Sequence, residues 1–377
     1  MKRILLCLLT LFFLPMPGQA VEINGKSGVL MDVATGTVLF EENPNERLAP
    51  ASVTKVMTML LIMEAVDDGR IAMTDTVTAS EAAAAKGGSQ VYLKVGETMT
   101  VREMLKSIAV SSANDCACAM AEHIAGSESA FVEKMNEKAA QLGMADTHFV
   151  NCTGLDDGPE AADHRTSAKD IALMSRELLK NHPKIKEFTT IWMDTIRNGT
   201  FGLSNTNKLV RFYPGATGLK TGFTSGAGYC LSATAEREGL ELIAVVMGAE
   251  TSAKRNESCK QLLDYGFANY ALYTPELTEA ATVPVKLGKA ETVSVQLSES
   301  GRLLVEKAKK SGITSETTTE PEISAPVAKG QRLGTMILRT GEEKLKEIPL
   351  VAGEDVPRLT FGDLAIKVLR RAAMARG

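Results

Sequence analysis

Ser52 and Lys55 form the pattern Ser-x-x-Lys, whose residue types and spacing suit nucleophilic chemistry. Residues three apart lie on one face of a helix, so the hydroxyl and the amine come within hydrogen-bonding reach. A serine hydroxyl is a weak nucleophile until a neighbouring base removes its proton. An amine serves as that base when burial or a second cation lowers its pKa. The free N–H groups at a helix start suit a developing oxyanion. The pair therefore predicts a serine nucleophile with a lysine base.

The residues after this pair indicate a buried helix, because 56–63 reads Val-Met-Thr-Met-Leu-Leu-Ile-Met and is apolar on every face. A serine N-cap followed by a surface lysine produces the same short pattern, so Ser-x-x-Lys alone is weak evidence. Two observations favour chemistry. This is the only Ser-x-x-Lys in the chain, and the helix that follows is too apolar to lie on a surface. We therefore expect Ser52 and Lys55 at the head of a central helix.

Two further short motifs carry polar groups at places where the chain changes direction. Ser112-Ala113-Asn114 interrupts a helical pattern that opens with the capping box Thr100–Glu103. Lys220-Thr221-Gly222 precedes a strong hairpin, in which 228–235 and 240–247 are strands joined by a Glu-Gly turn. Each motif is weak alone, and their meaning depends on whether the fold brings them together.

Composition excludes several classes of function. The first twenty residues of the 377 have a basic start, a short apolar stretch and small residues at the end, so they predict a secretory signal peptide. The net charge of −4 argues against a nucleic-acid partner. The four histidines show no metal-binding spacing, so neither a metal nor a cofactor is expected. Five cysteines follow the signal segment, and we expect buried, unpaired thiols in a large core.

The order of elements predicts an α+β fold in residues 21–275. Strands come first, in a hairpin over 28–40, helices follow, and strands return at 228–247. This order suggests one antiparallel sheet completed by both ends of the unit, with helices packed on it. A helix over 258–271 closes the unit.

The rest of the chain predicts two further parts. Residues 276–360 alternate apolar and polar side chains and predict a small β-sandwich-like, all-β domain, in which 314–322 is polar and turn-rich. Residues 361–377 predict a basic amphipathic helix on a membrane surface, with Phe361 and Leu364 on one face and Lys367 and Arg370 on the other. The alternative for this helix is docking on its own β domain.

The set Ser52–Lys55, Ser112–Asn114 and Lys220–Gly222, in this order, is typical of penicillin-binding proteins and class A β-lactamases. Over most of its length the chain resembles the serine-type D-alanyl-D-alanine carboxypeptidases, the low-molecular-mass penicillin-binding proteins. Asn205-Thr206-Asn207, the β domain and the basic tail share in this resemblance. It implies a β-lactamase/transpeptidase-like catalytic domain, peptidoglycan stem peptides ending in D-Ala-D-Ala as substrate, covalent inhibition by β-lactam antibiotics, and an extracytoplasmic location with peripheral membrane attachment.

The resemblance also implies roles in acyl transfer. The penultimate D-alanine carbonyl would acylate Ser52, and Lys55 would take the hydroxyl proton. Ser112 would relay a proton to the departing D-alanine, and Asn114 would hold the lysine and the substrate amide. The N–H groups of Ser52 and Phe223 would form the oxyanion hole. Phe223 departs from the polar residue, often histidine, expected after Lys-Thr-Gly.

The remaining implied roles concern the substrate carboxylate. Lys220 would attract it and, as a second cation, lower the pKa of Lys55. Thr221 would bind it. Gly222 has no side chain, which would let the substrate backbone pair with the strand edge. Arg255 is a further candidate carboxylate ligand, and a surface arginine that begins a helix is its alternative.

Three other functions fit the same motifs. A β-lactamase needs a carboxylate to activate the deacylating water, and Glu177 with Asn181 has a suggestive spacing, although Lys180 between them indicates a solvated face. An endopeptidase that cuts D-alanine cross-links would use the same residues as a carboxypeptidase. The third alternative is a non-catalytic cell-wall binder or sensor. The three motifs are intact, which argues against a loss of catalysis.

Overall fold

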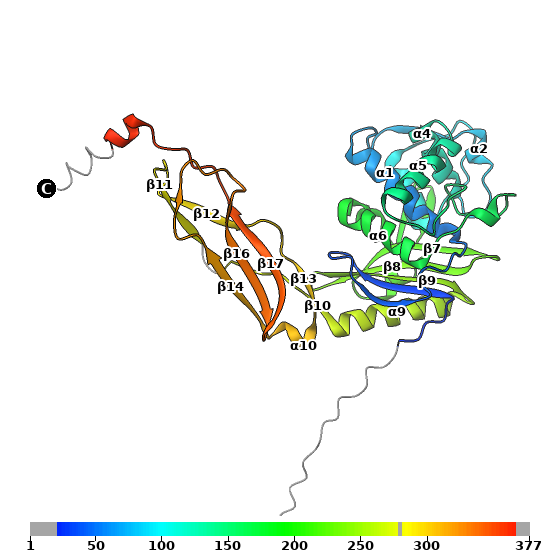
Figure 1. Ribbon diagram of the computed structural model, residues 1–377. Helices are drawn as coiled ribbons and strands as arrows, with labels where there is room; N and C mark the ends of the chain where they lie inside the picture. The colour runs from blue at the N-terminus through cyan, green and yellow to red at the C-terminus, as the bar shows by residue number, and fades with distance from the viewer. Residues whose placement is uncertain (1–20, 278–280, 367–377) are drawn as a thin grey trace, which may run out of the picture.

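The computed structural model describes residues 21–277 and 281–366. Its N-terminal part is built on a five-stranded antiparallel sheet in the order β2-β1-β9-β8-β7 (Figure 1). The first hairpin and the late strands share this sheet, which confirms the predicted α+β arrangement. The strands are β1 (Ser27–Asp32), β2 (Val38–Glu42), β7 (Ala216–Thr224), β8 (Gly228–Arg237) and β9 (Leu240–Ala249). Strand β7, which carries Lys220–Gly222, lies at one edge.

Helices cover both faces of this sheet (Figure 1). The central helix is α1 (Lys55–Asp67), whose residues Lys55–Met63 are all buried because other elements surround it. On the opposite face α9 (Ser252–Asn269) packs against β8 and β9. The other helices are α2 (Glu81–Ala84), α3 (Val101–Ser111), α4 (Asn114–Ala125), α5 (Glu128–Gln141), α6 (Ala168–Asn181), α7 (Lys186–Thr189) and α8 (Leu209–Phe212).

Short elements appear where the sequence showed no clear pattern. Strand β3 (Thr76–Thr78) pairs with β4 (Thr98–Thr100), and α2 lies between them in the chain. Strands β5 (Met193–Ile196) and β6 (Phe201–Ser204) form a second small hairpin. Helix α9 begins at Ser252, six residues before the predicted start, because Thr251 caps it.

The C-terminal part is all β, as predicted. A six-stranded sheet runs in the order β14-β16-β17-β12-β11-β15 around a core that includes Val283, Leu333 and Ile348. The segment expected to be turn-rich is instead edge strand β14, whose seven residues include four threonines. The elements are β10 (Tyr270–Tyr273), β11 (Thr282–Lys286), β12 (Thr292–Leu297), β13 (Leu303–Glu306), α10 (Lys307–Lys310), β14 (Ile313–Thr319), β15 (Ile323–Ser324), β16 (Arg332–Thr340) and β17 (Glu343–Ala352).

Two predicted segments fall wholly or partly outside the described residues. The predicted signal peptide, 1–20, lies outside them, as does the part of the C-terminal helix at 367–377. Residues 361–366 are helical, and their apolar side chains Phe361, Leu364 and Ile366 are exposed. Within the described ranges, none of the helices has the length and apolar character needed to cross a membrane. The five cysteines in those ranges are buried and free.

His164 links the loop after α5 to the start of the central helix. The Nδ1 atom accepts the Val150 N–H at 3.1 Å, and Nε2 lies 2.8 Å from Thr54 Oγ1. Burial, and then nearby positive charges, lower the pKa of this imidazole to about 4. The folded protein therefore disfavours the protonated ring, whose ordinary pKa is about 6.5. Its stabilising contribution is present above about pH 6.5 and is lost as the pH falls toward 4.

We therefore expect the stability difference between wild type and His164→Gln to depend on pH. The free energy of unfolding, measured in urea, should differ more between the two proteins at pH 7.5 than at pH 5, because glutamine does not titrate. An equal difference at both pH values would contradict the assignment of a neutral, buried His164.

Candidate active site

The structure brings Ser52 and Lys55 into direct contact. Ser52 lies in the 3₁₀ turn η1 (Ala51–Thr54), and Lys55 is the first residue of α1. The lysine Nζ lies 2.9 Å from the serine Oγ and 2.7 Å from the backbone carbonyl oxygen of Thr153, to which it donates. Lys55 is fully buried, and neither partner is charged. The hydroxyl and its candidate base are thus positioned before any substrate arrives.

Burial changes the proton affinity of both lysines in the site. It lowers the pKa of Lys55 to about 7, although the smaller electrostatic effects of Cys152 and Asp115 act in the opposite direction. The pKa of Lys220 is also well below its usual range, first because of burial and then because of the charges of Lys55 and Arg255. The sequence pointed to burial or a second cation as the cause of a lowered Lys55 pKa, and burial is the main one. A large fraction of Lys55 is therefore a neutral amine at neutral pH.

Ser112 and Asn114 lie at the break between α3 and α4. Ser112 is buried and adopts the left-handed conformation, with φ of 63°, which ends α3. Asn114 is buried too, and its Nδ2 donates to the Gly87 carbonyl at 2.7 Å. Its Oδ1 is buried without a hydrogen-bond partner in the described structure, and no bond joins Asn114 to Lys55. A free buried acceptor suits a substrate amide N–H, because an unpaired polar atom is otherwise costly.

The Lys-Thr-Gly motif lies on β7, next to the serine turn. Lys220 is buried, and its Nζ donates to the Thr221 carbonyl at 2.8 Å. The Thr221 hydroxyl donates to Thr206 Oγ1 at 2.6 Å. The exposed Phe223 ring stacks on Tyr229, with 4.3 Å between ring centroids. The strand therefore presents a hydroxyl and an aromatic surface at the sheet edge.

Gly222 is needed for close approach between β7 and the serine turn. A Cβ atom at this position would meet the Pro50 carbonyl oxygen at 2.7 Å and the Ser52 and Val53 nitrogens at 3.0 Å. These are backbone atoms, which do not move aside cheaply. The sequence suggested that the missing side chain leaves room for substrate, and the structure adds that it leaves room for the Ser52 N–H.

Arg255 does not lie on the surface, so that alternative is wrong. It belongs to the first turns of α9 and is only 4% exposed. Its guanidinium donates to the Cys230 carbonyl at 3.4 Å and to Asn256 Oδ1 at 3.0 and 3.1 Å. Its charge acts on Lys220, and its bond to the Cys230 carbonyl places it at β8, where Cys230 pairs with Gly222 of the Lys-Thr-Gly strand.

Two contributors to the site were not predicted as site residues. Thr153 acts through its backbone carbonyl, and a backbone group leaves no signature in residue type. Thr206 accepts from Thr221, and only its position in Asn205-Thr206-Asn207 pointed to it. Asn207 supports the same strand by donating to the Gly218 carbonyl at 2.8 Å.

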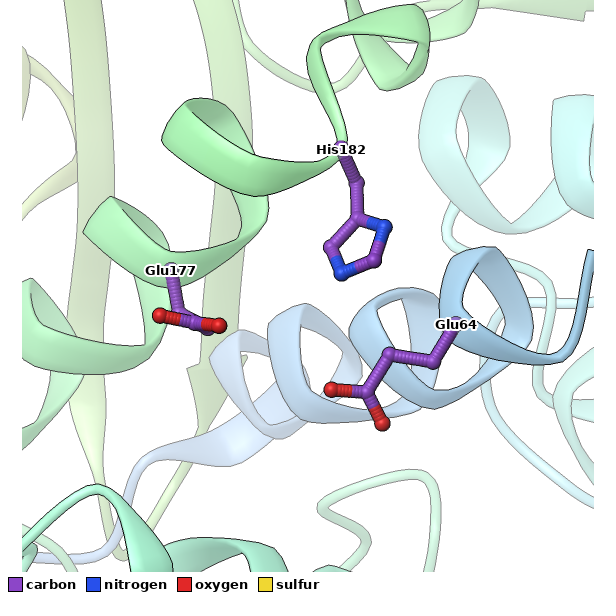
Figure 2. A group of neighbouring side chains, drawn as sticks. All are labelled: Glu64, Glu177 and His182. Carbon is purple, nitrogen blue, oxygen red and sulfur yellow. The ribbon is translucent and has the colours of Figure 1, made fainter. Parts of the chain in front are cut away.

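A cluster of possible metal ligands lies at the other end of α1. Figure 2 shows Glu64 facing Glu177 and His182, whose ligand atoms lie within 4.8 Å of one another. Both the acid on α1 and the histidine already have partners. Lys138 forms an ion pair with Glu64 at 2.8 Å, and His182 Nδ1 lies 2.6 Å from Asp67. The lysine ammonium opposes a cation at this position, so the cluster gives no reason to assign a metal.

The carboxylate considered for a β-lactamase lies in this distant cluster. Asn181 donates to Glu177 at 2.7 Å, so the two residues bond each other near the end of α6. Glu177 lies beside Glu64. Because Glu64 is twelve residues after Ser52, the two are separated by roughly 18 Å along the helix axis. A carboxylate at that distance does not reach water at a serine ester, and the geometry disfavours this alternative.

Comparison with known proteins agrees with this fold and site. The sequence model of the D-alanyl-D-alanine carboxypeptidase family matches residues 15–251, and that of the penicillin-binding protein 5 C-terminal domain matches 274–358. The chain is 48% identical over 345 residues to D-alanyl-D-alanine carboxypeptidase DacF of Bacillus subtilis, covering 90% of this chain and 87% of the relative.

Solved structures show the same fold. Penicillin-binding protein 5 of Haemophilus influenzae superposes with a TM-score of 0.74 at 30% identity, covering 90% of this chain and 99% of that one. Penicillin-binding protein D2 of Listeria monocytogenes in its ampicillin-bound form gives 0.60 at 31% identity, covering 66% of this chain and all of that one. The fold is therefore that of the low-molecular-mass penicillin-binding proteins. Within that class the chain belongs to the D-alanyl-D-alanine carboxypeptidase family, and it is a serine-type carboxypeptidase.

We expect Gly222→Ala to lower turnover of a D-Ala-D-Ala peptide by about a hundredfold, because a misplacement near 1 Å has effects of this size. The added Cβ pushes β7 away from the Ser52 N–H. Gly202→Ala on β6 is the control, because a Cβ there meets nothing within 4 Å. Near-normal turnover by Gly222→Ala would show that the close contact is not required.

Proposed function

We propose that the protein removes the terminal D-alanine from peptidoglycan stem peptides through an acyl-enzyme on Ser52. The 2.9 Å contact between its Oγ and a buried Lys55 amine carries this proposal. In the first step Oγ attacks the penultimate D-alanine carbonyl, and Lys55 takes the hydroxyl proton. The peptide C–N bond then breaks, and the D-alanine amine leaves with a proton relayed through Ser112. Water hydrolyses the ester and restores the serine.

The groups around this pair are suited to the rest of the substrate. The backbone N–H groups of Ser52 and Phe223 serve as the oxyanion hole. Thr221 supplies a hydroxyl, Arg255 a guanidinium and Lys220 a buried amine for the terminal carboxylate, whose negative charge would favour the protonated form of Lys220. The unpaired Oδ1 of Asn114 accepts the substrate amide N–H. The edge position of β7 leaves room for the substrate backbone to add alongside it.

The same reaction accounts for covalent inhibition by β-lactams. A β-lactam offers Ser52 a strained amide, and the resulting ester blocks the serine. The ampicillin-bound form of the Listeria structure supports this part of the proposal.

Ser52→Ala should abolish both release of D-alanine from a D-Ala-D-Ala peptide and covalent labelling by penicillin, because no other group supplies the attacking oxygen. The circular dichroism spectrum should stay that of the wild type, since the substitution removes only the hydroxyl of a half-buried side chain. Labelling is measured with a fluorescent penicillin and located by mass spectrometry. Normal labelling of the variant would place the nucleophile elsewhere.

We propose further that the protein is exported and attached to the outer surface of the membrane by its tail. Residues 21–275 then form the catalytic domain, 276–360 a small β domain without chemistry of its own, and 361–377 the attachment. The described start of the tail supports this, because Phe361 is 90% exposed and Ile366 is 54% exposed rather than docked on the β domain. Basic residues further along, such as Lys367, Arg370 and Arg371, add attraction to anionic lipid.

The mature protein, residues 21–377, should sediment with phosphatidylglycerol-rich vesicles at low salt and be released at high salt. The attraction is about 1 kcal/mol per basic residue near the surface and is screened by ions. A form ending at residue 360 should remain in solution and cleave a small peptide at the normal rate. Equal sedimentation of both forms would exclude attachment through the tail.

A further inference from the structure

A half-buried ion pair joins the segment that follows α2 to the start of α5. Lys86 follows α2, and Glu128 is the first residue of α5. The lysine Nζ lies 2.6 Å from Glu128 Oε2, and the two side chains are 24% and 22% exposed. Lys86 and Glu128 line one wall of a cavity of about 450 Å³, together with Gly87, Asn151 and Thr153.

The glutamate side of the pair is bonded to the segment that holds Lys55. Glu128 Oε1 accepts both the backbone N–H and the thiol of Cys152, each at 3.2 Å. The Cys152 carbonyl in turn accepts the Thr58 hydroxyl at 2.6 Å. The next carbonyl along the chain, that of Thr153, accepts from Lys55 Nζ at 2.7 Å. Glu128 therefore fixes the segment that determines where the catalytic amine points.

The lysine side of the pair is bonded to the segment that holds Asn114. Lys86 directly precedes Gly87, whose carbonyl accepts from Asn114 Nδ2 at 2.7 Å. The Ser89 carbonyl accepts the backbone N–H of Asn114, also at 2.7 Å. These two bonds determine the orientation of the amide and leave its Oδ1 free in the site.

The electrostatics favour a permanently charged pair. Burial would raise the pKa of Glu128, but hydrogen bonds from Lys86 and Cys152 outweigh it and lower the pKa. Burial would likewise lower the pKa of Lys86, and its bond to Glu128 raises it instead. The start of α5 also favours a carboxylate through the helix dipole. Neutralising one partner leaves the other charge half-buried and releases the loop that it holds.

We propose that the Lys86–Glu128 ion pair positions the catalytic groups, by fixing the Thr153 carbonyl that holds Lys55 and the Gly87 carbonyl that holds Asn114. This inference rests on the proposed acyl-enzyme mechanism. Neither Lys86 nor Glu128 reacts with substrate in this account. They act through two backbone carbonyls. In this way they set the spacing between Lys55, the base for Ser52, and Asn114, the acceptor for the substrate amide.

The test measures penicillin acylation of the full mature chain by stopped flow, which separates the initial dissociation constant from the rate constant of ester formation. Glu128→Gln and Lys86→Gln should each lower the acylation rate constant about 10–100-fold, with the dissociation constant changed less than threefold. The double variant should lose no more than either single variant, because the pair acts as one unit. Lys86→Arg keeps the charge and should retain most of the rate.

Glu64→Gln is the matched control. It breaks the Lys138–Glu64 pair, whose atoms are 2.8 Å apart and whose side chains are 19% and 17% exposed, at the far end of α1. Thermal unfolding is recorded for every variant. If Glu128→Gln does not fold, Lys86→Gln and Lys86→Arg carry the test.

Acylation of folded Glu128→Gln and Lys86→Gln within twofold of wild type would overturn the proposal. An equal loss of rate in Glu64→Gln would also overturn it, because the effect would then follow general destabilisation. Wild type that forms no penicillin ester, or a Ser52→Ala protein that still forms one, would instead refute the acyl-enzyme mechanism itself.

Discussion

The burial of Lys55 without a carboxylate in contact is the constraint on which the rest of the site depends. A buried ammonium is costly unless it is paired, so the neutral amine is favoured. The two hydrogen-bond partners of Lys55 are a hydroxyl and a backbone carbonyl, and neither compensates a full charge. In the described residues neither Lys55 nor Lys220 belongs to an ion pair, although twenty ion pairs are found elsewhere. In the proposed mechanism, Lys55 can act as a base at neutral pH because it is buried without a counter-ion.

To keep water away from the Lys55 amine, every surrounding element must pack closely against it. The central helix α1 is enclosed on all sides, which explains why its sequence is apolar on every face. Strand β7 approaches the serine turn so closely that only glycine fits at 222. On the other side, the loop of Thr153 packs against the Ala51 carbonyl at Gly154. This glycine has φ of +82°, and a Cβ added to it would lie 1.8 Å from the Ala51 oxygen. These contacts bring the Thr153 carbonyl, Lys55 and Ser52 together in one closely packed cluster.

The sequence predicts the reactive side chains of this site better than the backbone groups and elements that position them. Ser52, Lys55 and the Lys-Thr-Gly strand were singled out because the motifs occur together in this order, although each is weak alone. The capping box at Thr100 marked the start of α3 correctly. The Thr153 carbonyl was missed because a backbone group has no residue signature. Strand β14 was missed because its polar threonines resemble a turn-rich loop, although β-branched residues also suit an exposed edge strand. Arg255 required the structure, since its burial depends on where α9 begins.

The central claim is that a large fraction of Lys55 is a neutral amine in the resting enzyme at physiological pH. The direct measurement is an NMR titration of protein labelled with ¹³Cε-lysine, with the Lys55 resonance assigned by its loss in Lys55→Arg. The account predicts a titration midpoint near 7, the value to which burial lowers the pKa of this group. A midpoint close to the ordinary lysine value of about 10.4 would contradict it, because the ammonium would then hold its proton and Ser52 would need another base.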